Sequence, residues 1–148
     1  VYPAFVSNES QLSLVDDVFN AIMVNGDATG EVMFYGRGAG KLPTASAVVA
    51  DVIDCVKHMK ARKYLDWAPA EDNYVVNYLD IKTRLFIRAK TDDYNADKKS
   101  IVDNFGDVQF LSNEGNEIAF ITDENIEREL RNSLEKSGLK ADAVIHIL

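Results

Sequence analysis

The sequence predicts an α+β protein in which an antiparallel sheet with helices on one face follows a β-hairpin and a long helix. Two observations support this prediction. From Ile81 onward, apolar periodicity alternates between strand and helix in the order β-α-β-β-α-β. Before Ile81, two short apolar segments flank a glycine-containing turn, and a longer segment repeats apolar residues at helical spacing.

The C-terminal elements have clear boundary signals. Strands are predicted at 83–89, 108–111, 117–122 and 141–148. Residues 92–95 offer N-caps for a helix over 96–105 that Gly106 ends, and Thr122 or Asp123 is expected to cap a second helix that Gly138 ends. Right-handed crossovers would place both helices on one face of the sheet, which is the ferredoxin-like arrangement.

Side-chain spacing also predicts which faces are buried. Glu127 and Arg131 are expected to pair across one turn on the exposed face of the second helix. Alternation in the last strand places three apolar residues on one face: Ala143, Ile145 and Ile147. His58 and His146 are isolated in the sequence, so each is expected to lie on a surface or a strand face rather than to bind a ligand.

The first 62 residues predict the hairpin and the long helix. Apolar segments at 20–24 and 31–35 flank an Asn25-Gly26 turn signal, and both faces of this hairpin are apolar. Pro43 is expected at the first helical position. Apolar residues then recur at helical spacing: Ala45, Val48, Val49, Val52, Ile53, Val56 and Met59.

These patterns divide the chain into three parts: residues 1–62, a connector over 63–80, and a C-terminal domain over 81–148. The connector mixes aromatic with acidic residues and is too apolar for a free linker. It is expected to lie against both neighbours, with a short strand at 73–78 and Trp67 as a packing anchor.

Composition excludes several classes of protein. The net charge is −8 and both halves are acidic, so the basic patch that nucleic acid or an anionic membrane requires is missing. The sequence contains no apolar run of about 18 residues and no signal-peptide pattern. A single Cys predicts neither a disulfide nor a metal cluster, which favours the cytoplasm. The start at Val1 rather than Met suggests an excised or processed piece.

The glycine-rich run at 36–40 stands between a strand and a helix, where glycines allow a ligand to approach the backbone. It is not the dinucleotide fingerprint, because a third glycine would be needed at Lys41, and it is not a Walker loop, because Leu42 replaces Ser or Thr. A ligand-contacting loop and a tight structural turn both remain open. Arg37 could contact a phosphate or simply be exposed.

A longer run of residues is more specific. It reads Val18-Phe19-Asn20-Ala21, then Gly26-Asp27-Ala28-x-Gly30, then Met33-Phe34-Tyr35-Gly36-x-Gly38-Ala39-Gly40-x-x-Pro43-Thr44-Ala45-Ser46-Ala47-Val48-x-x-Asp51. This run resembles the end of the catalytic region of homoserine dehydrogenase, over roughly residues 1–60. The β-α-β-β-α-β tail lies where many bacterial homoserine dehydrogenases carry an ACT-type domain.

The resemblance implies an oxidoreductase that interconverts L-homoserine and L-aspartate 4-semialdehyde with NADP or NAD, in threonine and methionine biosynthesis. Gly38, Ala39 and Gly40 would approach the cofactor through their backbone, and Thr44 could add a hydroxyl contact. The family's catalytic Lys and Rossmann domain lie upstream. No residue here matches the catalytic motif, so this chain alone is expected to be inactive.

The ACT-type half departs from its family pattern. Amino-acid-binding ACT domains usually carry an Asp-x-Pro-Gly loop after the first strand, whereas here the sequence has Lys90-Thr91-Asp92-Asp93-Tyr94-Asn95. Binding of an effector, first of all threonine, near Asp92, Asp93 and Asn95 stands beside a structural or assembly role. Edge pairing of sheets predicts a homo-oligomer, a dimer first. The alternative is an amino-acid-sensing or oligomerisation module without a catalytic role.

Overall fold

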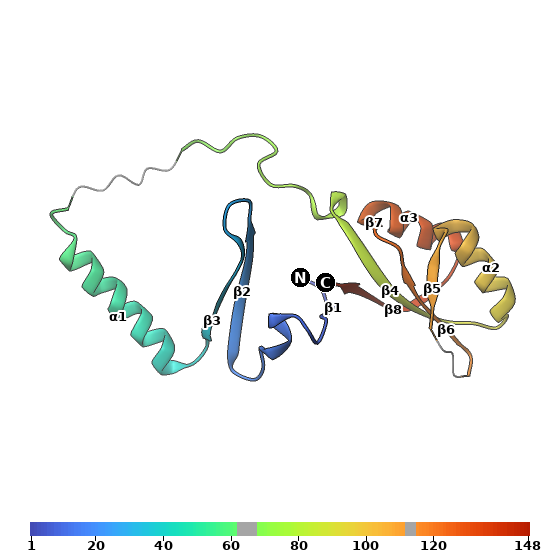
Figure 1. Cartoon of the computed structure of the whole chain (residues 1–148), viewed down its shortest axis with the longest axis horizontal. Helices are drawn as coiled ribbons and strands as arrows, with labels where there is room; N and C mark the ends of the chain where they lie inside the picture. Colours follow the sequence, from blue (N-terminus) through green and yellow to red (C-terminus); the bar gives the residue numbers. More distant parts are fainter. Residues whose placement is uncertain (62–67, 112–114) are drawn as a thin grey trace. The chain divides into compact units, whose positions relative to one another are not determined.

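The computed structural model describes residues 1–61, 68–111 and 115–148, which fall into two units (Figure 1). The N-terminal unit is Ser7–Ala70, and the C-terminal unit combines Val1–Val6 with Glu71–Leu148. The mixed α+β class is confirmed. This division differs from the predicted one in two respects: residues 1–6 join the C-terminal unit, and the unit boundary falls between residues 70 and 71, inside the predicted connector.

The C-terminal unit is a sheet with two helices packed against one face. The strand order is β1-β8-β4-β6-β5, and β7 also pairs with β4. β1 runs parallel to β8 and the other pairs are antiparallel. The elements are β1 (Ala4–Phe5), the 3-10 turn η2 (Tyr78–Asp80), β4 (Lys82–Lys90), α2 (Tyr94–Phe105), β5 (Val108–Phe110), β6 (Glu117–Thr122), β7 (Asn125–Ile126), α3 (Glu127–Ser137) and β8 (Ala141–Ile147).

The core of this unit lies between the sheet and the helices. Leu85 and Ile87 of β4 are fully buried on one face, as the alternation predicted, and they pack with Phe120 of β6. Ile101 of α2 and Leu130 of α3 close the core from the helical side. Because successive strand residues point to opposite faces, only one face of the sheet contributes to this cluster.

The predicted caps of α2 are confirmed, and so is Gly138 at the end of α3, but the predicted N-cap of α3 is not. The Asp93 carboxylate accepts the backbone N–H groups of Asn95 and Ala96, and Gly106 ends α2 with a φ of 75°. Helix α3 begins only at Glu127, after strand β7, and no side chain caps it. Thr122 cannot cap it because Thr122 still belongs to β6, where its hydroxyl accepts the N–H of Leu85.

The helices cover the face of β8 that carries His146, not the face that carries the predicted apolar residues. His146 pairs with Leu85, and Val144 pairs with Ile87. Paired residues of neighbouring strands share a face, so His146 and Val144 lie on the helix-covered side. The predicted apolar set, with Ile145 at its centre, faces away from the helices.

The N-terminal unit contains the predicted hairpin and helix. Its elements are η1 (Gln11–Leu14), β2 (Phe19–Gly26), β3 (Gly30–Arg37) and α1 (Lys41–Lys57). Gly26 still pairs with Gly30, so three residues form the turn rather than the Asn-Gly pair. Gly30 has a φ of 67°, as expected of a three-residue hairpin loop that ends in the left-handed region.

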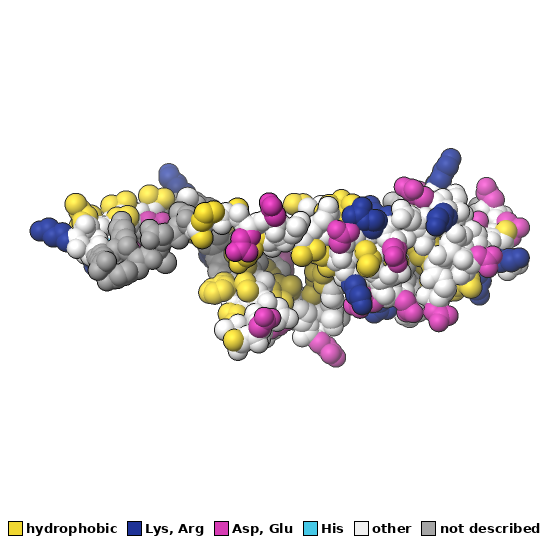
Figure 2. All heavy atoms as spheres, turned by 90° about the horizontal axis from the view of Figure 1, so that it is seen from above, with side chains coloured by type: hydrophobic (Ala, Val, Ile, Leu, Met, Phe, Trp, Pro, Cys, Tyr) yellow, Lys and Arg dark blue, Asp and Glu magenta, His cyan; other side chains and the backbone are white. Residues whose placement is uncertain are grey.

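Helix α1 begins at Lys41, two residues before the predicted start at Pro43. A proline is tolerated there because the first N–H groups of a helix have no partner within it. The apolar stripe of α1 lies open at the surface (Figure 2), and Val49, Val52 and Val56 are each more than half exposed. The hairpin likewise exposes Phe34.

The prediction of a strand at 73–78 is wrong. Residues 72 and 73 form a turn in which Asn73 has a φ of 64°, and Tyr78 opens η2. Tyr74 and Val75 are more than 80% exposed, so the predicted packing of the connector is not found for them. Trp67 lies outside the described residues.

Phe120→Ala tests the proposed core. We expect the free energy of unfolding of the C-terminal unit to fall by about 3–5 kcal/mol, because the substitution removes contacts and leaves a cavity. Urea unfolding followed by circular dichroism measures this value. Phe34→Ala, an exposed phenylalanine of the hairpin, is the control. Equal small losses in both variants would contradict the assignment of the core.

Candidate functional site

The glycine run connects β3 to α1, and its backbone geometry requires glycine at one position. Gly40 precedes the helix with φ 117° and ψ 156°, a region that side-chain-bearing residues essentially never adopt. Its carbonyl accepts the N–H of Thr44 at 3.1 Å, the first bond of the helix. Gly40 therefore fixes the angle at which the chain enters α1.

Gly38 lies close to the side chain of Asn20 on the neighbouring strand. A Cβ atom added to Gly38 would lie 3.0 Å from Asn20 Nδ2. A Cβ atom on Gly36, two residues earlier in the chain, would meet nothing within 4 Å. The Asn20 side chain of the hairpin therefore lies against Gly38, whereas open space surrounds the Cβ position of Gly36.

The start of α1 adds a favourable potential for negative charge. The N–H groups of Lys41 and Leu42 precede Thr44, the first helical donor, and the first turn carries no acidic residue. Thr44, the predicted hydroxyl donor, is exposed in this first turn. The four predicted cofactor-binding residues therefore lie together at one end of α1.

Arg37 has a position that the sequence left open. Its guanidinium carbon lies 5.0 Å from the centroid of the Phe19 ring, and Phe19 stacks on Tyr35 at 4.9 Å. This stack holds the arginine against the hairpin. The arrangement favours a structural role for Arg37.

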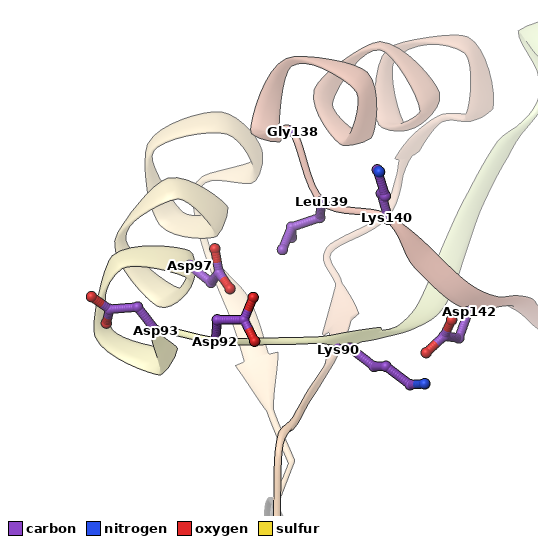
Figure 3. Close-up of a pocket in the computed structure, with 8 residues that line it drawn as sticks. All are labelled: Lys90, Asp92, Asp93, Asp97, Gly138, Leu139, Lys140 and Asp142. Carbon is purple, nitrogen blue, oxygen red and sulfur yellow. The ribbon is translucent and has the colours of Figure 1, made fainter.

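A second candidate site is a pocket of about 530 Å³ in the C-terminal unit (Figure 3). It is formed by the end of β4, the start of α2 and the α3–β8 connection. The residues that line it are Lys90, Asp92, Asp93, Asp97, Gly138, Leu139, Lys140 and Asp142. Two of the three predicted effector residues, Asp92 and Asp93, are in this set, and Asn95 is not.

The carboxylates of this pocket differ in their hydrogen-bond partners and in their orientation. Asp93 caps α2, and Asp97 accepts a hydrogen bond of 2.6 Å from the Thr91 hydroxyl. Asp92 and Asp97 point toward Leu139, whereas Asp93 points away from them (Figure 3). Four carboxylates against two lysines give a lining charge of −2 when all six groups are ionised. Such a lining favours a ligand that carries an ammonium group.

A buried ionic network lies at the other end of α3, where the sequence predicted an exposed pair. Glu127 is only 3% exposed and accepts hydrogen bonds from Arg131 at 2.6 and 2.9 Å. His146 Nε2 lies 3.2 Å from the second carboxylate oxygen. The i,i+4 pairing was predicted correctly. Its exposed position holds for the Arg131 side chain, which is 49% exposed, and is wrong for Glu127, which is buried beside His146 of β8.

The environment of Glu127 sets the direction of its pKa shift. Burial raises the pKa, but the hydrogen bonds from Arg131 and the contact with His146 more than offset it, so the pKa lies below its usual value of 4.5. Glu127 is therefore ionised at neutral pH. His146, expected on a surface or a strand face, lies on a face of β8 and is 4% exposed.

The described residues contain neither a metal-binding cluster nor a membrane-spanning helix. Within 1–61, 68–111 and 115–148, no group of three or more His, Cys, Asp or Glu is placed to hold a metal ion. None of the helices in these ranges combines the length and apolarity needed to cross a membrane.

Comparison with known proteins finds one family that resembles the N-terminal part of this chain. The sequence profile of the family described as homoserine dehydrogenase matches residues 1–53. The homoserine dehydrogenase of Neisseria gonorrhoeae is 51% identical over 61 residues, which are 41% of this chain and 14% of that protein. That of Synechocystis is 54% identical over 56 residues, 38% of this chain and 13% of that protein.

The fold has known counterparts as well. A homoserine dehydrogenase from Thiobacillus denitrificans superposes on 99% of this chain with a TM-score of 0.74 and 23% identity, using 38% of its own length. One from S. aureus at pH 7.5 superposes on 97% with a TM-score of 0.68 and 24% identity, using 36%. The resemblance to homoserine dehydrogenase is confirmed, and the chain spans a small part of these relatives.

Glu127→Gln tests the buried network. At pH 7 we expect it to lower the free energy of unfolding by about 1–3 kcal/mol, because the amide replaces a charged acceptor of Arg131. The pKa of Glu127 is lower in the folded state than in the unfolded state, so its ionised form stabilises the fold at pH values above the unfolded pKa. The difference in unfolding free energy between Glu127→Gln and wild type should therefore vanish as the pH falls through the folded-state pKa, which lies below 4.5.

Urea midpoints between pH 7 and pH 3 measure this dependence. Glu129→Gln is the matched control, since Glu129 lies in the same first turn of α3 and is exposed. If Glu127→Gln lowers the free energy of unfolding by the same amount at every pH in this range, the charge of Glu127 does not contribute to stability.

Proposed function

We propose that this chain is the C-terminal part of a cytoplasmic homoserine dehydrogenase, which interconverts L-homoserine and L-aspartate 4-semialdehyde with NADP or NAD in threonine and methionine biosynthesis. The main support is the glycine run of the N-terminal unit. It lies inside the segment that matches the family, at residues 1–53, and its backbone is open at the start of α1.

In this proposal the glycine run forms one wall of the cofactor site. Gly38, Ala39 and Gly40 present backbone without obstructing side chains, and the first N–H groups of α1 favour a negatively charged group nearby. Thr44 adds a hydroxyl. The nicotinamide group, when bound, supplies or accepts the hydride.

The chemistry itself is assigned to the upstream part of the protein. Hydride transfer to a carbonyl needs an acid or base beside the reacting oxygen. The Gly38–Gly40 run offers backbone only, and no residue here matches the family's catalytic motif. The 148-residue chain alone is accordingly expected to show no turnover.

For the C-terminal unit we propose an ACT-type regulatory or assembly domain. The element order β4-α2-β5-β6-α3-β8 and the strand order β8-β4-β6-β5 support a ferredoxin-like arrangement. The acidic pocket is the proposed effector site. An amino acid such as threonine would direct its ammonium group to Asp92 and Asp142 and its carboxylate to Lys90 or Lys140.

Assembly of this domain is the second candidate role. Edge strands with free backbone groups tend to pair with another chain, and β5 is an edge of the C-terminal sheet. A homodimer joined through such an edge would explain a domain that has lost the Pro-Gly loop. Sedimentation of the chain at tens of micromolar separates dimer from monomer.

Gly40→Ala tests whether the glycine run forms part of the cofactor site. The substitution is made in the longer protein that contains the region upstream of Val1. We expect the affinity for NADP or NAD to fall about tenfold or more, because a Cβ at this backbone conformation displaces the run. Titration with the oxidised cofactor measures the dissociation constant. Gly36→Ala is the matched control, with open space around it. Equal affinities for both variants would contradict the assignment.

The effector pocket is tested by isothermal titration of the 148-residue chain with threonine, then methionine, isoleucine, serine and homoserine. Saturable binding by one of them is expected to weaken about tenfold in Asp142→Asn, which removes a charged partner from the pocket. Asp123→Asn, an exposed acid outside the pocket, should bind as wild type does. Silence across the panel would favour the assembly role.

A further inference from the structure

Strand β1 makes the C-terminal unit discontinuous in sequence. Val1–Val6 belong to it, Ser7–Ala70 form the other unit, and the chain returns at Glu71. The two units are therefore joined covalently at two places, between residues 6 and 7 and between residues 70 and 71. While β1 stays in the sheet, the N-terminal unit is tethered to the C-terminal unit at both of its ends.

Few contacts hold β1 in the sheet. Pro3 and Phe5 carbonyls accept the N–H groups of His146 at 3.3 Å and Leu148 at 3.0 Å. Phe5 meets Phe86 edge to face at 5.4 Å, and Tyr2 stacks on the ring of His146 at 3.8 Å with an interplanar angle of 27°. The paired stretch is only two residues long.

Docking of β1 on β8 is opposed by the loss of hydration at the His146 ring. Both ring nitrogens are closed to solvent and neither has a hydrogen-bond partner among the described residues. Nε2 makes only the ionic contact of 3.2 Å with Glu127. A buried polar atom that loses water without gaining a partner opposes the docked state, and departure of Tyr2 would hydrate the ring again.

We propose that β1 is a releasable latch, which docks on β8 through Tyr2 and Phe5 and undocks without unfolding of the C-terminal core. Release removes one of the two tethers of the N-terminal unit. β8 carries His146 near one end and Asp142, a lining residue of the acidic pocket, near the other. The strand that binds the latch thus also borders that pocket. The latch itself does not depend on the proposed enzymatic function.

Amide hydrogen exchange of the 148-residue chain, measured residue by residue by NMR, tests the latch. A latch opens by local unfolding, so the amides of His146 and Leu148 should exchange at least about a hundredfold faster than that of Ile87, which reports global unfolding. Phe5→Ala, which removes the contact with Phe86, should accelerate the two β8 amides about tenfold further and leave Ile87 unchanged.

His146→Phe separates a latch from ordinary strand fraying. It keeps an aromatic ring for Tyr2 and removes two buried nitrogens that lack hydrogen bonds. Glu127 loses its contact with Nε2 but keeps the hydrogen bonds from Arg131, so exchange at positions 146 and 148 should slow about tenfold relative to Ile87. His58→Phe, which changes the chain's other histidine, is the control and should alter neither amide. Using the ratio to Ile87 corrects for any loss of global stability in the variants.

Two results would overturn the proposal. One is exchange of His146 and Leu148 at the rate of Ile87, which would make β1 an integral part of the core. The other is an unchanged or faster relative exchange at position 146 in His146→Phe, which would show that the unpartnered nitrogens do not oppose docking.

Discussion

Burial of one face of the C-terminal sheet beneath α2 and α3 is the constraint on which that unit depends. Leu85, Ile87 and Phe120 can be removed from water only if both helices lie on the same side. This layer fixes where the helices end, and the polar features gather at its rim. The acidic pocket forms at the start of α2 and the end of α3, and the Glu127 network forms at the start of α3.

The N-terminal unit has no comparable layer within the described residues. Its helix and hairpin are each amphipathic or apolar, yet Val52 and Phe34 are more than half exposed. Exposed apolar surfaces of this extent usually mark an interaction site. The matched part of the chain covers only about a seventh of its sequence relatives, at 14% and 13%. Both observations support the proposal that this chain is one part of a longer dehydrogenase.

Local signals in the sequence predicted most elements, and tertiary pairing decided the rest. Asp93 as a cap and Gly138 as a terminator depend on their own neighbours, so they were predicted correctly. The face of β8 that the helices cover depends on its register with β4, which no local pattern encodes. His146 was expected on a surface or a strand face, and only the pairing with Leu85 shows that this face is the buried one. Likewise, Asp92 and Asp93 were identified from one loop, whereas Asp142 joins them only because β8 lies beside β4.

The central claim is that the Gly38–Gly40 run completes a homoserine dehydrogenase. The most direct test is homoserine-dependent reduction of NADP or NAD, followed by absorbance, in the protein that contains the region upstream of Val1. We expect turnover by that longer protein and none by the 148-residue chain under the same conditions. Turnover by the 148-residue chain alone, or none by the longer protein with either cofactor, would contradict it.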